Sequence, residues 1–360
     1  MTVELKIDGL IHSGWKSARI TRGIERVASD FSLTVTEKTG TSSTVPDIRP
    51  GRLCELLDSG EKIVTGYVDE VSTGYDAGRR TVTFRGRSKT SDLVDCSAIN
   101  KPGEWSDVGL AKIAADIAAV YGVSVISGDV GEAFSTFRLQ PAETAFNAIE
   151  RACRMRAVLA TDDAEGRLVL TRAGADRAST EIRCTPADRA RNNVLSADAL
   201  FSHRDRYSKY TVKGQAAGTD DIFGEAAAQP VASATDAGIT RRREIILQSE
   251  TQGGAGTMRE RVEWEKAVRE GKSLTATYTL QGWREASGTL WRPNSIVSVV
   301  DDMGGVRGDL LISEVTYSID DRGSLAILSV LPPEAFTRLR EAEDSGGGSV
   351  DPLAKYLGGA

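Results

Sequence analysis

The feature that most constrains this chain is an internal repeat, in which residues 49–84 and 292–328 share one pattern. Each copy opens with Arg-Pro, at Arg49 and Arg292, and runs through an apolar segment to an aspartate. A second apolar segment ending in Glu-Val follows, then a glycine turn and a third segment. Because a repeated sequence indicates a repeated structural unit, the pattern predicts two related β units. The alternative is that two antiparallel meanders share turn chemistry by chance.

The spacing of apolar residues predicts a mainly β chain with α+β insertions. In Phe31, Leu33 and Val35 the apolar side chains fall at every second position, which is typical of a strand with one buried face. We expect two related β-barrel domains and smaller α+β subdomains. The expected boundaries are 1–96 for the first β-barrel domain, with 176–200 as a candidate to complete it; 97–175 for an α+β subdomain; 201–225 and 273–335 for the second β-barrel domain; 226–272 for a loop and helix insertion; and 336–360 for a flexible C-terminal tail.

Three helices are expected from start and stop signals. The first has Ser106 as its N-cap and ends at Gly122, and the second begins at Pro141, a residue suited to the first turn of a helix. The third begins at Thr257, which forms a capping box with Glu260. The segment 216–238 is rich in Ala, Gly and Asp and is expected to be a long exposed loop, in line with the insertion predicted there.

The charge balance excludes several classes of protein. With 45 basic and 51 acidic side chains the formal net charge is −6, which argues against a protein that holds phosphate groups. The arginine clusters at 189–191, 204–206 and 241–243 are expected to lie in salt-bridging surface loops. The chain shows no signal peptide and no apolar run long enough for a membrane span, so we expect synthesis in the cytoplasm and no stable membrane association.

Residues for common catalysis are scarce. Only two histidines, His12 and His203, are present, so a Ser-His-Asp triad is improbable, and the cysteine spacing contains no zinc half-site. The pairs Asp162-Asp163, Asp220-Asp221 and Asp301-Asp302 fall in expected turns. We therefore assign no catalytic, cofactor-binding or metal-binding residue and expect no cofactor. Two tryptophans, Trp283 and Trp291, are expected in the core, and the cysteines are expected to be buried thiols: Cys54, Cys96, Cys153 and Cys184.

A series of short motifs, in order from about residue 10 to 336, resembles the Mu-type phage baseplate hub proteins, a family related to the tube-to-spike hub of contractile-tailed phages. The linker 216–256 carries none of them. The motifs are Gly14-Trp15, Ile20–Glu25, Phe31–Leu33, Thr65–Asp69, Gly86–Ser97, Arg154–Leu159, Arg206–Gln215, Gly282–Arg284, Leu290–Asn294 and Pro333–Phe336.

The resemblance implies a structural protein of the virion tail baseplate rather than an enzyme. It implies a homotrimer whose six β-barrel domains form a pseudo-hexameric ring, assembled in the host cytoplasm. The implied partners are the tail tube or a tail-tip protein above, the central spike protein below, other baseplate proteins, and DNA only transiently in an axial channel. The net negative charge suits such a channel, and we expect acidic residues to line it, because Lys/Arg–phosphate contacts would retard DNA.

Two rival functions remain open at this point. One is a hub-associated cell-wall-degrading enzyme whose general acid is a Glu or Asp; two carboxylates facing one cleft would be required. The other is a carbohydrate-binding β protein.

Overall fold

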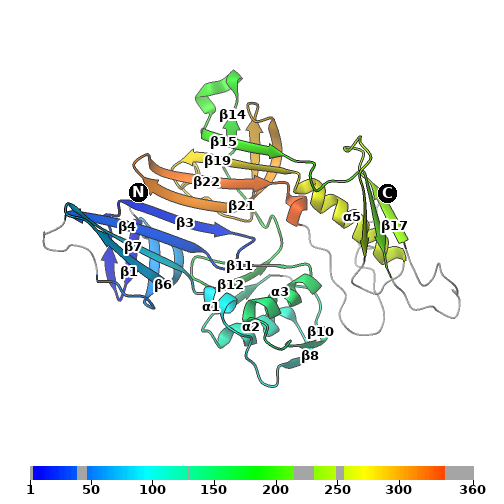
Figure 1. Cartoon of the computed structure of the whole chain (residues 1–360), viewed down its shortest axis with the longest axis horizontal. Helices are drawn as coiled ribbons and strands as arrows, with labels where there is room; N and C mark the ends of the chain where they lie inside the picture. Colours follow the sequence, from blue (N-terminus) through cyan, green and yellow to red (C-terminus); the bar gives the residue numbers. More distant parts are fainter. Residues whose placement is uncertain (1–2, 39–46, 129, 215–230, 249–254, 337–360) are drawn as a thin grey trace.

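The computed structural model describes residues 3–38, 47–128, 130–214, 231–248 and 255–336. Strands predominate, and one large sheet of 14 strands forms the body of the molecule (Figure 1). The α-helices of the described residues lie in two side units, one that contains α1, α2 and α3 and one that contains α5. The expected class, mainly β with α+β insertions, is confirmed.

The N-terminal strands form the first half of the large sheet, in the order β3-β4-β7-β6-β5-β1-β2. The alternation in β4 is as expected, since Phe31 and Leu33 are buried in the core. Leu5 and Leu56, from β1 and β5, pack in the same core. The strands are β1 (Val3–Ile7), β2 (Leu10–His12), β3 (Ser17–Gly23), β4 (Asp30–Lys38), β5 (Leu53–Asp58), β6 (Glu61–Tyr75) and β7 (Arg79–Ser88).

The second half of the sheet has the order β15-β19-β22-β21, and β20 pairs with β21. Trp283 and Trp291 are buried in its core, as expected. Its elements are β13 (Asp176–Arg177), β14 (Ile182–Cys184), the 3-10 helix η1 (Pro186–Arg191), β15 (Val194–Phe201), β19 (Leu274–Gln281), β20 (Ser295–Asp301), β21 (Val306–Asp320), β22 (Gly323–Leu331) and the 3-10 helix η2 (Pro333–Phe336).

The two copies of the sequence repeat fold alike. Each contains a 15-residue strand, β6 or β21, that pairs with a short strand along its first part and with a third strand along its second part. A bulge interrupts each long strand immediately before its Glu-Val pair, at Glu70 and at Glu314. The expectation that these strands end at Glu-Val is wrong, because the bulge bends the strand without ending it.

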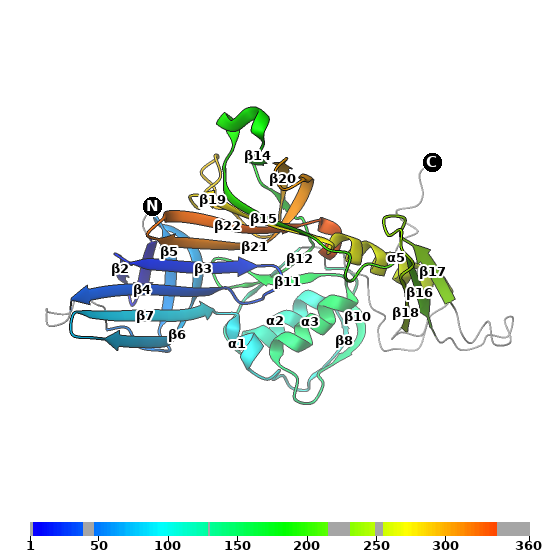
Figure 2. The same ribbon diagram turned by 45° about the horizontal axis from the view of Figure 1, so that its top comes forward.

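The two halves are joined edge to edge into one sheet. β3 of the first half pairs antiparallel with β21 of the second, with Ile20 opposite Tyr317, and one continuous core lies beneath both. In both views these strands run side by side with β4, β7 and β22 (Figure 2). Arg284 of the second half also binds the buried carboxylate of Asp58 in the first, at 2.8 and 3.0 Å. The halves therefore form a single body.

An α+β unit with its own core follows β7. Its helix and strand types are as expected, but both expected starts are wrong. Ser106 lies in β8, and α2 is preceded by Gly109; α3 starts four residues after Pro141, because Thr144 caps it by accepting a hydrogen bond from the Asn147 amide. The elements are α1 (Ser91–Asp95), β8 (Glu104–Val108), α2 (Leu110–Ala119), β9 (Val125–Ser127), β10 (Phe134–Arg138), α3 (Ala145–Met155), β11 (Leu159–Asp162) and β12 (Leu168–Thr171).

A second side unit is inserted between β15 and β19. It is a three-stranded sheet in the order β17-β16-β18, covered by α5 through Met258 and Val262. Helix α5 starts at Ala255, so Thr257 lies in its first turn and is not the N-cap. The elements are β16 (Lys209–Lys213), β17 (Val231–Thr235), β18 (Glu244–Gln248) and α5 (Ala255–Gly271).

These pairings correct three expected boundaries. Residues 176–200 do not complete the first β unit, because β13 and β14 pair with β20 and β15 pairs with β19. The segment 201–225 does not join the second barrel, because β16 pairs only with β17 and β18 among the described strands. The insertion 226–272 contains two strands in addition to its helix, and one of them, β17, falls in the expected loop 216–238.

The remaining expectations concern the cysteines, the tail and the membrane. Cys54 and Cys153 are buried, Cys96 and Cys184 are only half-buried, and no disulfide joins any two of them. The expected flexible tail 336–360 lies outside the described residues, apart from Phe336. In the part of the chain that the structure describes, no helix is long and apolar enough to cross a membrane.

Candidate functional site

The face of the large sheet that points away from the core is lined with hydroxyl groups. Side chains alternate between the two faces of a strand, and directly opposed residues share a face, so the pairing register identifies its members. We call this surface the hydroxyl face. Its serines and threonines are Ser17, Thr21, Ser32, Thr34, Thr36, Ser72, Thr81, Thr83, Ser196, Thr275, Thr277, Thr279, Thr316, Ser318 and Ser329.

The hydroxyl groups bond to one another across the strands. Thr34 and Thr83 are joined at 3.2 Å between their Oγ1 atoms, and Thr316 bonds to Thr21 at 3.4 Å across the junction of the two halves. The face also holds a depression of about 220 Å³ between β3, β4, β21 and β22. A shared network of this kind fixes side chains that are otherwise free to rotate, so the face is an ordered polar surface.

Several charged groups at the hydroxyl face form ion pairs. Glu314 binds Arg26 at 2.9 Å, Arg26 also binds Asp30, and Glu70 lies 3.5 Å from Arg85. Each of these carboxylates lies beside an arginine. Arg19 and Asp198 also belong to this face, opposite Ser32 and Thr277, and both are exposed. Sequence analysis missed the hydroxyl face, although the alternation Thr275, Thr277, Thr279 is a signal for it.

Two long strands of the sheet, β15 and β6, each have an edge that is open over several residues. Among the described residues, β15 pairs in the sheet only with β19, and the second part of β6 only with β7. Both edges expose large side chains: Tyr75 on β6 is 80% exposed, and Leu200 and Phe201 on β15 are each 58% exposed. Open edges with apolar side chains are ready to pair with another strand.

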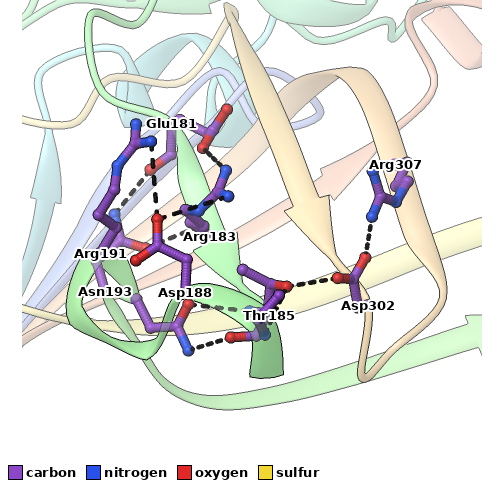
Figure 3. A network of polar contacts seen from close by, with 10 residues as sticks. Glu181, Arg183, Thr185, Asp188, Arg191, Asn193, Asp302 and Arg307 are labelled. Carbon is purple, nitrogen blue, oxygen red and sulfur yellow. Dashed lines mark hydrogen bonds and ion pairs between the residues drawn. The ribbon is translucent and has the colours of Figure 1, made fainter.

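A polar network joins the residue before β15 to β14, and the end of β14 to the β20–β21 hairpin (Figure 3). Asn193 accepts a hydrogen bond from the Arg183 amide and donates one to the Glu181 carbonyl, at 2.9 and 2.7 Å. Thr185 donates to Asp302 at 2.6 Å, and this bond together with Arg307 lowers the pKa of that carboxyl. These bonds fix the start of the edge strand β15 within the chain itself.

A buried carboxylate fastens the α+β unit to the end of the sheet. Asp162 accepts hydrogen bonds from the Ser29 amide at 3.0 Å and from the Ser29 hydroxyl at 2.8 Å. Burial raises the pKa of Asp162, while Arg22, Ser88 and Ser29 oppose that shift. The unit is thereby held at the end of the first half where β3 stops and β4 starts.

The residues considered for catalysis are scattered. His12 lies in β2, whereas His203 follows β15. Asp162 and Asp301 are buried at strand ends and bonded to their surroundings, and Asp220-Asp221 lie outside the described residues. No group of three or more His, Cys, Asp or Glu side chains able to hold a metal occurs in the described part of the chain.

The arginine clusters at 204–206 and 241–243 lie in loops, as expected, whereas residues 189–191 are the last residues of the 3-10 helix η1. Arg206 binds Asp236 and Glu270, at 2.5 and 2.9 Å. Tyr207, next to Arg206, lies within cation–π range of Arg243 and Arg269, at 5.1 and 5.6 Å.

Family models cover most of this architecture and define its class. Residues 2–88 match the N-terminal domain of Mu phage baseplate assembly protein GpP-like proteins, 90–172 the second domain of gp44-like baseplate hub proteins, and 254–339 the fourth domain of GpP. A protein with this combination of domains is a phage tail baseplate component.

The relatives specify the family. Baseplate hub protein gp44 of Escherichia phage Mu is 35% identical over 371 aligned positions, which cover 98% of this chain and 95% of gp44. The chain belongs to the family of Mu-type baseplate hub proteins.

Solved structures agree. The 43 kDa tail protein of prophage MuSo2 from Shewanella oneidensis is 34% identical with a TM-score of 0.84, and the match covers 94% of this chain and 100% of that one. A tail protein from Neisseria meningitidis MC58, at 21% identity and a TM-score of 0.78 over 94% and 98% of the two chains, shares the fold.

Proposed function

We propose that three copies of this chain close into a ring that joins the tail tube to the central spike of a phage baseplate. The observation that carries the proposal is the sheet itself, in which two equivalent halves, β15-β19-β22-β21 and β3-β4-β7-β6, lie edge to edge. Three copies would place six such units in one ring. A ring of this kind has threefold symmetry with approximate sixfold symmetry, which suits a joint between a threefold and a sixfold partner.

The hydroxyl face is the wall of the proposed channel. A wall of paired charges and hydroxyl groups offers DNA few fixed cationic contacts, so the duplex slides with little retention. Contact with DNA is transient in this account, and the lasting partners are the tail tube or a tail-tip protein, the spike and other baseplate proteins. The proposed location is the virion tail baseplate, after synthesis and assembly in the host cytoplasm.

Native mass spectrometry of the purified chain, with and without the tube and spike proteins of the same tail, tests the proposal. We expect a mass of three chains and the binding of one spike trimer per ring. A two-chain assembly, or a trimer that binds neither protein, would contradict it. A zymogram on cell-wall substrate tests the rival hub-associated enzyme; clearing by the purified chain would support a Glu or Asp general acid and a revised assignment.

A further inference from the structure

The two open edges of the sheet match each other, and the inference drawn from them rests on the proposed ring. We propose that β15 of one copy pairs antiparallel with residues 71–75 of β6 in a second copy. The joint between copies would then repeat the joint within each copy, where β3 pairs with β21. The occupant of each edge is a second copy of this chain.

The pairing register of the two halves makes β15 the equivalent of β3 and β6 the equivalent of β21. Ala18 lies opposite Leu33 in β4, and Ala197 lies opposite Tyr278 in β19. Following the register across the next two strands leads to Val71 in β6 from Leu33, and to Val315 in β21 from Tyr278. Each of these valines directly follows a glutamate, Glu70 or Glu314. β3 and β21 are already joined, so of these four strands only β15 and the second part of β6 have an open edge among the described residues.

This equivalence fixes the register between copies. Within the chain, Thr316 lies opposite Thr21 and Tyr317 opposite Ile20. The corresponding residue of Thr316 is Ser72 in β6, and that of Thr21 is Leu200 in β15. The account therefore places Ser72 of one copy opposite Leu200 of the next. Neighbouring pairs follow as Val71 with Phe201, Thr73 with Ala199 and Tyr75 with Ala197.

The side chains at these positions fit a buried joint. Tyr75, 80% exposed, lies on the same side of β6 as Val71, and Phe201, 58% exposed, lies opposite Leu274. Val71 and Leu274 both pack against the core, so Tyr75 and Phe201 are on the core side of their strands. Pairing would cover both, as Tyr317 and Ile20 are covered at the inner joint with no measurable exposure. Exposed aromatic side chains beside an open edge are typical of an interface rather than of a free surface.

The proposed contact between copies is head to tail, because each copy has one β15 edge and one β6 edge. Such a heterologous contact leaves two unsatisfied edges in any open chain of copies and none once a ring closes. Closure would also make the hydroxyl face continuous around the ring, since Ser72 and Leu200 point to that face. The strand edges themselves therefore favour a closed ring over a filament.

Cysteine cross-linking tests the register in the full chain. Opposed residues of an antiparallel pair have Cα atoms about 4.5–5.5 Å apart, within the range that a disulfide spans. The test variant is Ser72→Cys with Leu200→Cys. The matched control at the inner joint is Thr21→Cys with Thr316→Cys, and the offset control is Ser72→Cys with Ala199→Cys, whose side chains point to opposite faces.

We expect the test variant to give covalent species of two and three chains on non-reducing gels, all reversed by reductant. The inner-joint control should cross-link within one chain and keep its single-chain mass, and the offset control should stay unlinked. A trimer in native mass spectrometry without this cross-link, or equal linking of the offset pair, would overturn the proposed joint and leave the hub function standing. A chain that stays monomeric at every concentration would overturn both.

Discussion

At the scale of single residues, the buried carboxylate of Asp162 ties the α+β unit to the sheet. Its removal leaves the Ser29 hydroxyl without its partner in a dry environment, while the Ser29 amide keeps its 3.1 Å bond to the Ser88 hydroxyl, so the cost is about 1–2 kcal/mol. We therefore expect Asp162→Ala to lower the free energy of unfolding by that amount in urea denaturation. A loss below 0.5 kcal/mol, the scale of an ordinary surface change, would contradict this role.

The same residue makes stability depend on pH. Burial raises the pKa of Asp162 in the folded chain above its unfolded value of about 3.9, so the folded state holds the proton more tightly. Its contribution is fully present below the unfolded pKa and is lost as pH rises through the folded pKa. As pH rises from the unfolded to the folded pKa of Asp162, the free energy of unfolding of the natural chain should fall relative to that of Asp162→Asn. If the difference between the two chains stayed constant with pH, the raised pKa would be contradicted.

Cys54 is predicted to be an inert thiol. Burial, with a smaller effect of Asp69, raises the pKa of Cys54 to about 12, and its exposed fraction is 1%. Because the thiolate is the reactive form, iodoacetamide at pH 8 should label Cys54 only as fast as the chain unfolds. Peptide mass spectrometry of the labelled chain checks this, and rapid labelling of Cys54 in the native state would contradict it.

Single residues also show what sequence can and cannot predict. The burial of Trp283 and Trp291 follows from their size and their apolar surroundings. The role of Asp162 does not, because its partner Ser29 is 133 positions away and the pair meets only in the folded chain. A pattern along the chain carries no signal for such a contact.

At the scale of elements, a salt-bridge contact stabilises the junction of the two halves. It joins the β19–β20 connection to the β5–β6 turn. Arg284 binds the buried Asp58, whose side chain is 0% exposed, and also Glu61 at 2.5 Å. Arg284→Ala leaves the Asp58 carboxylate buried without its cation. Since Arg284 is itself partly exposed, we expect a loss of about 2–3 kcal/mol, somewhat below the value for a fully buried pair.

The matched control for that variant is Arg292→Ala. Arg292 lies 3.6 Å from Glu61, and its side chain is 55% exposed, so its removal should change stability by less than about 0.5 kcal/mol. Thermal and urea unfolding of both variants measure the difference. Equal effects of the two changes would show that the buried Asp58 does not depend on Arg284.

The elements that sequence predicted well are those with a strong local pattern. β4 alternates clearly, and α2 and α3 have a buried stripe at helical spacing. Partners of strands were harder to predict, because β16 alternates like a barrel strand yet pairs with β17 and β18 of the side unit. β17 was missed altogether, since Val-Ala-Ser-Ala-Thr offers little apolar contrast.

At the scale of the whole molecule, the side chains of the hydroxyl face should determine whether the assembled ring retains DNA. Lysines at Thr34 and Thr277, one in each half, would place six cations on the proposed channel wall of three chains. We expect this variant to retain linear duplex DNA in gel-shift assays with a strong loss of binding as salt rises. The control Thr235→Lys, on the side unit, should not.

Binding of closed circular DNA distinguishes lysines inside a channel from lysines on an ordinary outer surface. A duplex must thread a closed ring by a free end, so the lysine variant should retain linear DNA but not circular DNA of the same length. Equal retention of both forms would place Thr34 and Thr277 on an outer surface and contradict the proposed channel wall.

The sequence repeat predicted the two β units because their turn chemistry and strand lengths survive in both copies. It did not predict how the units meet. β3 pairs with β21 over residues 314–319, directly after the bulge in β21, and one core lies beneath both strands. These are properties of the folded sheet, and so are the open edges that remain.

An electron cryo-microscopy map of the purified assembly would show directly whether three chains form a closed ring joined through β15 and β6. We expect threefold symmetry, six similar lobes, a strand of one copy beside residues 71–75 of the next, and the hydroxyl face around an open bore. An assembly in which β15 or the second part of β6 stays unpaired, or in which the hydroxyl face lies on the outside, would contradict it.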